Sequence, residues 1–248
     1  MRVVVLGYGG WVSNPTYGHT SILVTSETGS VLLDAGEGVF RDLFECGYSD
    51  LKRIKAIVLT HGHGDHTLGL PTIAQFAKVF NARLLIVGLE KTLTSLVEIL
   101  RATSVSNYEC CLEFVPVKHG DVVEVAGIKM KFAEVPHTIP SIAVRVEESG
   151  TGRCLTYSGD TSYSEELVRL AEGCDLLMHE ASFSDTEASL ARSLGHSTVS
   201  DCIRVGVEAK NRLIVPLHFG LEEPRIDLTS LPKSITVVYP AKCLTIDV

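Results

Sequence analysis

The sequence predicts an α/β fold in which two β-sheets pack face to face and helices cover their outer surfaces, giving four αββα layers. Hydrophobic residues make up 45% and charged residues 21% of the 248 residues, which is typical of a globular protein with a sizeable core. Short β-branched runs and segments of helical periodicity occur in both halves of the chain. No linker, short repeat or proline-rich segment divides it, so residues 1–248 are expected to form a single domain.

The first half mixes strands and helices. Each predicted strand is a short apolar run that stops at Gly, Asp, Thr or His. These strands are Val3–Leu6, Ser21–Thr25, Val31–Asp34 and Ala56–Thr60. Apolar residues at helical spacing predict helices at Val39–Cys46, Leu70–Phe80 and Glu90–Ala102.

The second half repeats this mixture, with more strands. Strands are predicted at Glu113–Val117, Val122–Val125, Ile128–Val135, Ile142–Val146, Cys154–Ser158, Leu176–Met178, Leu213–Pro216, Ile235–Val238 and Leu244–Val248. Helices fit Ser164–Glu172 and Ser197–Lys210, and the second of these begins with a Ser-Thr capping signal. For Leu190–Leu194, a candidate lid, no periodicity decides the structure.

Composition excludes several classes of protein. Apolar runs such as Val3–Gly7 are far shorter than the roughly 18 residues that a membrane-spanning helix needs. The 22 Lys and Arg against 30 Asp and Glu give a formal net charge of −8, which disfavours a non-specific nucleic-acid coat protein but leaves a local basic cleft open.

Cysteine usage and the first residues bear on the compartment. The seven cysteines are odd in number and include no CxxC pair, so neither a disulfide framework nor a thiolate zinc site is expected. We expect reduced core residues at Cys46, Cys110, Cys111, Cys154, Cys174, Cys202 and Cys243. The apolar stretch within residues 1–10 is too brief for a signal peptide. Together these features predict a cytoplasmic protein that does not bind a membrane.

The glycine-rich segment Gly7-Tyr8-Gly9-Gly10 matches a dinucleotide-binding turn only in part. It follows a predicted strand, and Asp34 lies downstream as the acidic residue of such a motif would. However, the glycines lead into a loop with Pro15 rather than into a helix, and the third glycine position is not filled. We therefore interpret this segment as a strand-to-loop turn.

The dominant motif lies where the strand ending at Leu59 meets a helix. His61, His63, Asp65 and His66 fall within six residues, although the whole chain has only nine histidines. Imidazole nitrogen combined with carboxylate oxygen, without sulfur, favours zinc, manganese or iron over magnesium or calcium. The motif therefore predicts a metal site.

Further candidate ligands stand at the ends of other predicted strands. His137, Asp160 and His218 each terminate an apolar run. Strand ends project side chains into a shared cleft, and the two oxygens of Asp160 could bridge a pair of metals.

These motifs resemble the metallo-β-lactamase superfamily. The resemblance covers nearly the whole chain, including Leu33–Glu37 and Ser158–Thr161. It implies a metallo-β-lactamase-type αββα sandwich with two divalent metal ions per chain, zinc foremost, and manganese or iron as alternatives. By the same resemblance one ion is held by His61, His63, His137 and Asp160, and the other by Asp65, His66, Asp160 and His218. The scaffold hosts many hydrolytic reactions, so it does not identify the substrate.

Two more segments are similar to the RNase Z branch, whose enzymes trim the 3′ ends of tRNA. Met178–Phe183 resembles its HEAT segment, with Ser182 in place of the usual Thr, and Gly195–Thr198 resembles its HST segment. This resemblance implies that His196 donates a proton to the leaving oxygen and that Glu180 orients His196. Asp65, with the metals, would position and deprotonate the attacking water.

Several residues are candidates for supporting roles. We expect Asp34 or Glu37 to support ligand imidazoles, and His179 to be structural. The side chains of Trp11, Tyr17 and His19 are candidates for a substrate wall on which a base or aryl group could stack, with ordinary packing as the alternative. His119 is interpreted as part of a plain turn.

The chain departs from the RNase Z branch in two places. Only 23 positions separate His137 from Asp160, which leaves no room for the arm with which that family grips tRNA. The stretch Val12–His19 contains no Lys or Arg, where short members of the family carry a basic loop.

The favoured hypothesis is a two-metal phosphodiesterase that acts on RNA or on a small phosphodiester, in the manner of RNase Z. One alternative keeps the metals and hydrolyses a thioester, lactone or other ester. The other alternative is a non-catalytic metal-binding module, which the full ligand set disfavours. The resemblance also implies a homodimer.

Overall fold

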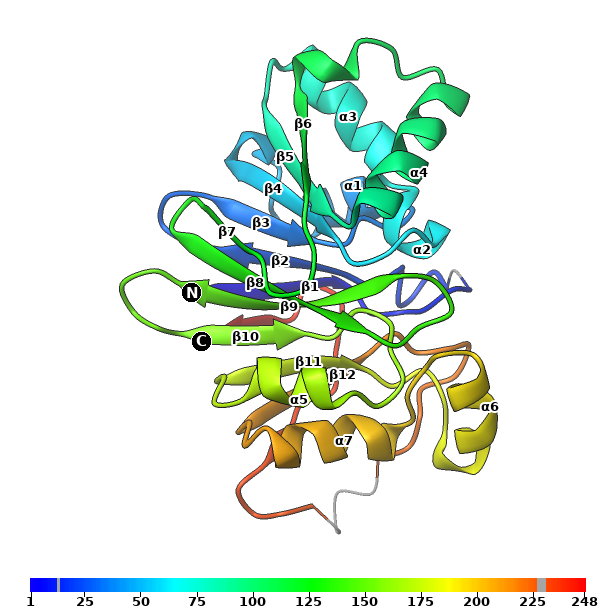
Figure 1. The fold of residues 1–248 in the computed structure, drawn as a ribbon. Coiled ribbons are helices and arrows are strands. Elements are labelled where there is room, and N and C mark those ends of the chain that lie inside the picture. Colours follow the sequence, from blue (N-terminus) through cyan, green and yellow to red (C-terminus); the bar gives the residue numbers. More distant parts are fainter. Residues whose placement is uncertain (13, 227–230) are drawn as a thin grey trace.

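The computed structural model describes residues 1–12, 14–226 and 231–248. Two seven-stranded sheets pack face to face, and helices cover their outer surfaces (Figure 1). The predicted four-layer αββα arrangement is therefore confirmed. The first and last strands pair with each other, so the two chain ends lie side by side.

The first sheet has the strand order β14-β1-β2-β3-β4-β5-β6. Its strands are β1 (Arg2–Gly7), β2 (Ser21–Thr25), β3 (Ser30–Leu33), β4 (Ile54–Leu59), β5 (Leu84–Gly88), β6 (Leu112–Pro116) and β14 (Thr245–Asp247). Its helices are α1 (Val39–Glu45), α2 (Gly64–Thr67), α3 (Leu70–Val79) and α4 (Glu90–Ala102), with short 3₁₀ turns at Leu51–Arg53 and Tyr108–Cys110.

The second sheet has the order β13-β12-β11-β10-β9-β8-β7. Its strands are β7 (Val122–Val125), β8 (Ile128–Val135), β9 (Ser141–Glu148), β10 (Cys154–Tyr157), β11 (Leu176–Glu180), β12 (Leu213–Leu217) and β13 (Thr236–Val237). Its helices are α5 (Glu165–Ala171), α6 (Ala188–Ser193) and α7 (Val199–Glu208), with a 3₁₀ turn at Asp185–Glu187.

Strand direction places the polar residues of both sheets at one edge. Strands β3 to β6 run parallel to one another, as do β10 to β13. Parallel strands that are covered on both faces are apolar along their length, so the first polar side chain comes at the strand end. The C-terminal ends of β4, β10, β11 and β12 therefore lead into the polar residues that are candidates for the functional site.

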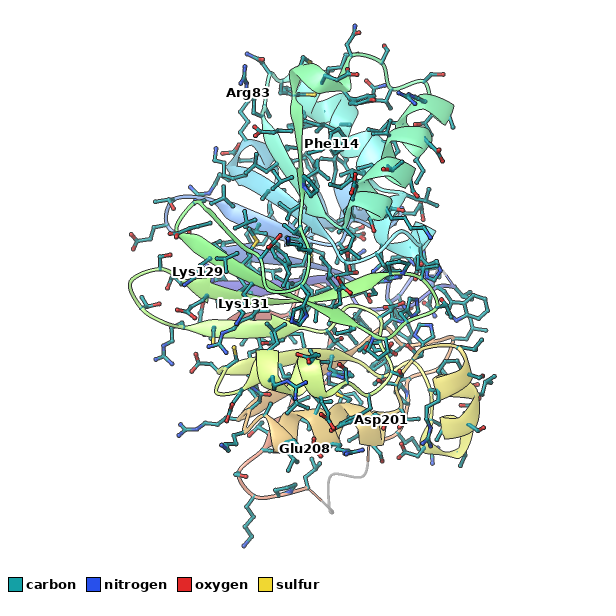
Figure 2. The ribbon with its side chains drawn as sticks, viewed as in Figure 1. Arg83, Phe114, Lys129, Lys131, Asp201 and Glu208 are labelled. Atoms are coloured by element: carbon teal, nitrogen blue, oxygen red, sulfur yellow. A yellow bond between two sulfur atoms is a disulfide. The ribbon has the colours of Figure 1, made fainter. Side chains whose placement is uncertain are left out.

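The core has two parts. The larger cluster joins the inward faces of both sheets with α5 and α7, and includes Val58, Phe132 and Tyr157. The smaller one lies between the first sheet and its helices. Strand β8 shows the expected alternation, since Lys129 and Lys131 are exposed on either side of buried Met130 (Figure 2).

Most element predictions agree with the structure, but strand β5 and helix α2 lie outside the predicted elements. The helix Glu90–Ala102 has its predicted bounds, and the Thr198 side chain caps α7 by accepting a hydrogen bond from the Asp201 amide. Strand β5 was not predicted, because a five-residue apolar run between helices has no periodicity that separates strand from helix. The segment left open around Leu190 forms helix α6.

The cysteine prediction is wrong for three residues. Cys46 and Cys243 form a disulfide with a Cα–Cα distance of 5.1 Å, and Cys110 is exposed. The bond joins the end of α1 to the segment before β14, so it depends on the long-range pairing of β14 with β1, which no local pattern reveals. One premise of the cytoplasmic prediction thus fails, since disulfides are rare in that compartment. Cys111, Cys154, Cys174 and Cys202 are buried and free, as expected.

Two further predictions concern a membrane-spanning helix and a dinucleotide-binding turn. Among the described residues, no helix combines the length and the apolar character needed to cross a membrane. After β1 the glycine segment enters a loop, and the described residues before β2 form no helix, so they do not build a dinucleotide-binding turn.

Candidate metal centre

All seven predicted metal ligands lie together at one edge of the sandwich. His61 and His63 come from the loop after β4, and Asp65 and His66 from α2. The other three ligands follow strands of the second sheet: His137 after β8, Asp160 after β10 and His218 after β12. Both sheets therefore contribute to the site.

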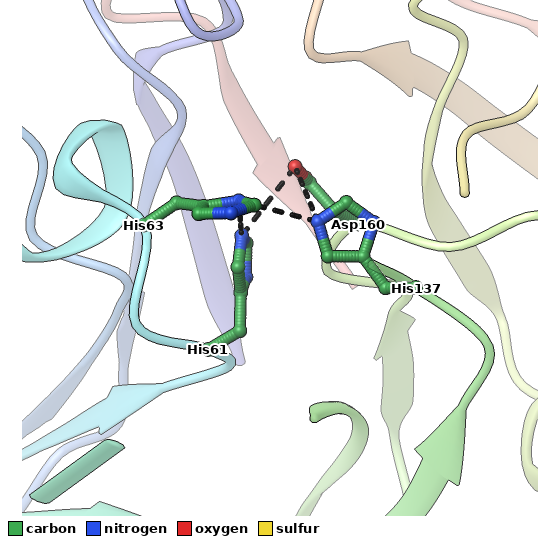
Figure 3. Close-up of side chains that lie close together, drawn as sticks. All are labelled: His61, His63, His137 and Asp160. Carbon is green, nitrogen blue, oxygen red and sulfur yellow. Dashed lines mark hydrogen bonds and ion pairs between the residues drawn. The ribbon is translucent and has the colours of Figure 1, made fainter. Parts of the chain in front are cut away.

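The first cluster consists of His61, His63, His137 and Asp160 (Figure 3). The Nδ1 atom of His63 lies 3.1 Å from Nε2 of His61 and 3.2 Å from Nε2 of His137. Oδ2 of Asp160 lies 3.6 Å from Nε2 of His61. Donor atoms about 3.3 Å apart are what a tetrahedral ion with bonds of about 2.0 Å requires. The cluster therefore fits a zinc-sized ion.

The second cluster shares Asp160 and adds Asp65, His66 and His218. Oδ2 of Asp65 lies 3.2 Å from Nε2 of His218 and 3.4 Å from Nε2 of His66. Oδ1 of Asp160 is buried, has no hydrogen-bond partner among the described residues and lies 3.3 Å from Nε2 of His66. A carboxylate oxygen buried in this way fits a ligand position, and one carboxylate between two clusters fits a bridge.

Asp34, which directly follows β3, supports the ligands, as expected. Its Oδ2 accepts hydrogen bonds from Nδ1 of His66 at 2.7 Å, from Oγ1 of Thr60 at 2.8 Å and from the hydroxyl of Tyr157 at 2.8 Å. Oγ1 of Thr60 in turn lies 3.0 Å from Nδ1 of His61. These contacts leave Nε2 of both imidazoles facing the clusters. The alternative support, Glu37, is wrong: it is exposed and no hydrogen bond joins it to a described ligand.

The charge states of three imidazoles and two carboxylates suit metal binding. Burial lowers the pKa of His61, His63 and His137, so their imidazoles are neutral and offer lone pairs. Burial would raise the pKa of Asp160, but His218, His66 and His61 hold it well below its usual range. The same balance, with His218 and His66, lowers the pKa of Asp65. Both carboxylates are therefore ionised.

Glu180 and His196 form a pair beside the second cluster. Glu180 ends β11 and is buried, and its Oε1 accepts hydrogen bonds from Nδ1 of His196 at 2.9 Å and from the Thr161 amide at 2.7 Å. Its Oε2 accepts from the Ser182 hydroxyl at 2.6 Å and from the Ser197 amide at 3.0 Å. Although burial alone would lower the pKa of His196, the negative charge of Glu180 raises it to about 9. His196 is therefore a cationic acid whose Nδ1 is already bonded.

Ser182 is a functional candidate that sequence reasoning did not assign a role. Its Oγ lies 2.8 Å from Nδ1 of His218 and donates to Glu180, so it links the candidate acid pair to a candidate ligand. The signal was available, because the motif places Ser where the resembling family has Thr and both residues carry a hydroxyl at Cβ.

The loop that carries His196 also supports the first cluster. Nδ1 of His137 donates to the Gly195 carbonyl oxygen at 2.8 Å. Gly195 has φ = +69°, and a Cβ there would lie 2.9 Å from the Cα of His137, so only glycine allows this approach.

The remaining candidates take structural positions. His19 is buried and its Nδ1 bonds the Gly10 carbonyl oxygen at 2.9 Å, so it packs inside rather than forming a substrate wall. The ring of Tyr17 packs against that of Tyr8 at a tilt of 35°, with 4.8 Å between the ring centroids. His179 is buried, with Nδ1 2.6 Å from the Glu180 carbonyl oxygen, and His119 lies in a turn. Trp11 is different, because 71% of its surface is exposed.

Comparison with known proteins gives the same class of fold. Residues 30–219 match the family described as "Beta-lactamase superfamily domain". The chain is 31% identical over 272 residues to ribonuclease Z of Ignicoccus hospitalis, covering 88% of each chain. It is 26% identical to ribonuclease Z of Methanosarcina acetivorans, covering 89% of this chain and 88% of that one. Human short-form tRNase Z has the same fold, with a TM-score of 0.83 at 24% identity over 100% of this chain and 99% of that one.

The chain therefore belongs to the beta-lactamase superfamily. Within that superfamily it is similar to proteins named ribonuclease Z over most of their length and its own.

Proposed function

We propose that this protein is a hydrolase of phosphodiester bonds that uses two divalent metal ions, as its ribonuclease Z relatives suggest. The observation that carries the proposal is the pair Glu180–His196, hydrogen-bonded at 2.9 Å beside the two clusters of imidazoles and carboxylates. A metal-dependent hydrolase of activated esters needs no such acid, whereas an alkoxide leaving from phosphate does.

The ligands would divide as their geometry suggests. His61, His63 and His137 would hold one ion, Asp65, His66 and His218 the other, and Asp160 would bridge them. When bound, the ions supply charge that stabilises the phosphoryl oxygens and lowers the pKa of water. The nitrogen and oxygen donors favour zinc, and manganese or iron are the alternatives.

Three side chains would handle protons. Asp65 lies at the less buried side of its cluster, where its carboxylate would orient and deprotonate the attacking water. His196 would protonate the leaving oxygen through Nε2, because its Nδ1 is bonded to Glu180. Glu180 would hold His196 both cationic and in place, and its own four hydrogen bonds keep it ionised.

The substrate would be the 3′ end of an RNA or a small phosphodiester. Between His137 and Asp160 the structure contains only the pair of strands β9 and β10, so no arm is inserted in this segment. The stretch 12–19 carries no Lys or Arg, and the formal net charge is −8. A large folded RNA would find little positive charge from these sources.

We also propose a homodimer, formed through a row of aromatic side chains on α1, on α3 and on Phe80, which directly follows α3. The rings of Phe40 and Phe44 lie 5.2 Å apart, those of Phe40 and Phe76 5.8 Å apart, and those of Phe76 and Phe80 4.4 Å apart. Phe44 and Phe80 are about half exposed, at 47% and 50%. Exposed apolar patches of this kind are typical of protein interfaces. Sedimentation of wild type should give a dimer, and Phe44→Asp/Phe80→Asp a monomer.

The function is tested by metal content and hydrolysis together. Purified wild type and His196→Ala are compared on an RNA with a 3′ trailer, on adenylyl-adenosine, on bis(p-nitrophenyl) phosphate, and on a p-nitrophenyl ester and a thioester. We expect about two ions per chain and hydrolysis of phosphodiesters, with loss of about 10²–10⁴-fold in His196→Ala on alkoxide leaving groups. The loss on p-nitrophenyl leaving groups should be smaller, because they need less protonation.

His119→Ala is the matched control, because it removes a histidine from a turn outside the site. Turnover of only the ester or thioester, with no effect of His196→Ala, would replace this proposal by the ester hydrolase. Metal binding without any turnover would favour a binding module.

A further inference from the structure

A groove of about 670 Å³ adjoins the candidate metal centre. One wall comes from the loop after β1 and from the segment after β12, and the other from the segment after β11. Its apolar lining consists of Trp11, Val12, Phe183 and Leu221, and we call its charged lining residues, Glu187, Glu222, Glu223 and Arg225, the rim.

The groove lies beside the proposed acid. Ser182, which lines it, is hydrogen-bonded to Glu180 and lies 3.4 Å from Nδ1 of His196. The ring of Phe183, also in the lining, lies 5.9 Å from the His196 ring. The Gly10 amide donates to the Phe219 carbonyl oxygen at 2.7 Å, which holds Trp11 beside the segment that follows His218. A leaving group that receives its proton from His196 therefore departs next to this groove.

The lining is suited to a flat aromatic group. Trp11 and Leu221 are 71% and 66% exposed, although large apolar side chains are normally covered. A nucleobase stacks on an exposed indole whatever its sequence identity, because every base has a π-face.

The rim is suited to a group without further negative charge. The groove is lined by three carboxylates and only one guanidinium, so the charge of these four groups is negative. Glu222 and Glu223 are exposed, and neither is paired with a described cation within 4.0 Å. A second phosphate placed here would be repelled, whereas a neutral nucleoside would not.

We propose that this groove binds the leaving group of the substrate, and that this group is an uncharged nucleoside or similar aromatic alcohol without a second phosphate. Trp11 is then a specificity-determining residue, and Glu222 and Glu223 exclude a continuing polyanionic strand. The inference rests on the proposed phosphodiesterase function, because the leaving side is defined by His196. It narrows the substrate class to short or terminal phosphodiesters.

The chain itself supplies a direct probe, because Trp11 is its only tryptophan. Adenosine added to the metal-loaded protein should quench Trp11 fluorescence in a saturable manner, and ribose at the same concentration should not. This measurement needs no turnover, so it separates the groove from the reaction.

Kinetics then test the assignment to the leaving side. On adenylyl-adenosine, Trp11→Ala should raise KM about tenfold with kcat within twofold, and Trp11→Phe should restore most of the loss. Val122→Ala, which shortens an exposed side chain on β7, is the control and should leave KM unchanged.

Charge selectivity is tested with the same dinucleotide carrying one extra phosphate at either end. The products show which end leaves, and a phosphate at that end should raise KM several-fold. Glu222→Gln/Glu223→Gln should remove this discrimination, whereas Glu98→Gln/Glu109→Gln, which changes the net charge equally on exposed residues of other elements, should retain it.

The possible failures are distinguishable. Hydrolysis of the dinucleotide with KM unaffected by Trp11→Ala would overturn the groove assignment and leave the proposed function standing. Absence of diester hydrolysis in wild type would overturn the proposed function, and with it the leaving-group assignment. Failure of adenosine to quench Trp11 would overturn the aromatic-binding groove in either case.

Discussion

The two halves of the chain build the site in different ways. The first half supplies four candidate ligands from residues 61–66, a single loop and short helix that Asp34 supports. The second half supplies His137, Asp160 and His218 one at a time, from the ends of separate strands. His137 and His218 are each oriented by a different partner, the Gly195 carbonyl oxygen and the Ser182 hydroxyl. Local sequence thus sets the geometry of the first group, whereas sheet order and loop packing set that of the second.

The largest effect is expected where the two halves meet, at Asp160. Asp160→Ala removes an oxygen ligand from both clusters, so the chain should bind fewer than two ions and phosphodiester hydrolysis should fall to the background rate. Elemental analysis and hydrolysis of bis(p-nitrophenyl) phosphate measure this, and a chelator should abolish wild-type activity until zinc is restored. Asp247→Ala, an exposed aspartate paired with Arg2, is the control. If Asp160→Ala keeps its full metal content and activity, the two clusters bind metal without needing Asp160 as a shared ligand.

The next effect concerns the acid pair, which comes wholly from the second half. Glu180→Gln removes the charge that keeps His196 cationic, so kcat on adenylyl-adenosine should fall about 10²-fold or more. The fall on p-nitrophenyl substrates should be smaller, because their leaving group needs little protonation. Glu172→Gln, on the surface, serves as the control. An equal fall on both kinds of substrate would instead indicate that Glu180 acts through folding.

A smaller effect compares the supporting residues of the two halves. Asp34→Asn disturbs His66 directly and His61 through Thr60, so metal affinity should drop about 10–100-fold. Ser182→Ala removes one hydroxyl that contacts His218, and we expect a drop near the lower end of that range. Isothermal titration with zinc measures both, and Ser182→Thr should behave as wild type because it keeps the hydroxyl. A larger loss in Ser182→Ala than in Asp34→Asn would reverse the comparison.

The same difference between the halves explains what the sequence could predict. His61, His63, Asp65 and His66 stand in one six-residue motif, which local spacing makes visible. His137, Asp160 and His218 were found because each ends an apolar run, although only the parallel order of β10 to β12 brings the latter two together. The contacts of Ser182 were not foreseen, since they depend on loops after β11 and β12 meeting. Strand β5 and the disulfide were missed for a similar reason: each is defined by its neighbours in space.

The smallest effect on activity, and a large one on stability, is expected at the Cys46–Cys243 disulfide, which ties the C-terminal segment to α1 of the first half. The bond closes a long loop, since 197 positions separate the two cysteines, and it therefore restricts the unfolded chain. Cys46→Ser/Cys243→Ser should lower the free energy of unfolding by about 2–4 kcal/mol, measured by urea denaturation. Its kcat should stay within twofold of wild type, because no described metal or acid candidate contacts either cysteine.

Cys110→Ser, which replaces an exposed free thiol, is the control for that comparison. Dithiothreitol should shift the wild-type unfolding midpoint to that of the double variant and leave the variant unchanged. If reduction has no effect on the unfolding of wild type, the disulfide contributes nothing to stability. The C-terminal segment would then be held on the first half by the pairing of β14 with β1 and by the ion pair of Lys242 with Asp42. If reduction instead abolishes hydrolysis, the loop that contains residues 61–66 depends on the C-terminal segment. Its geometry would then be set by distant parts of the chain as well as by its own sequence.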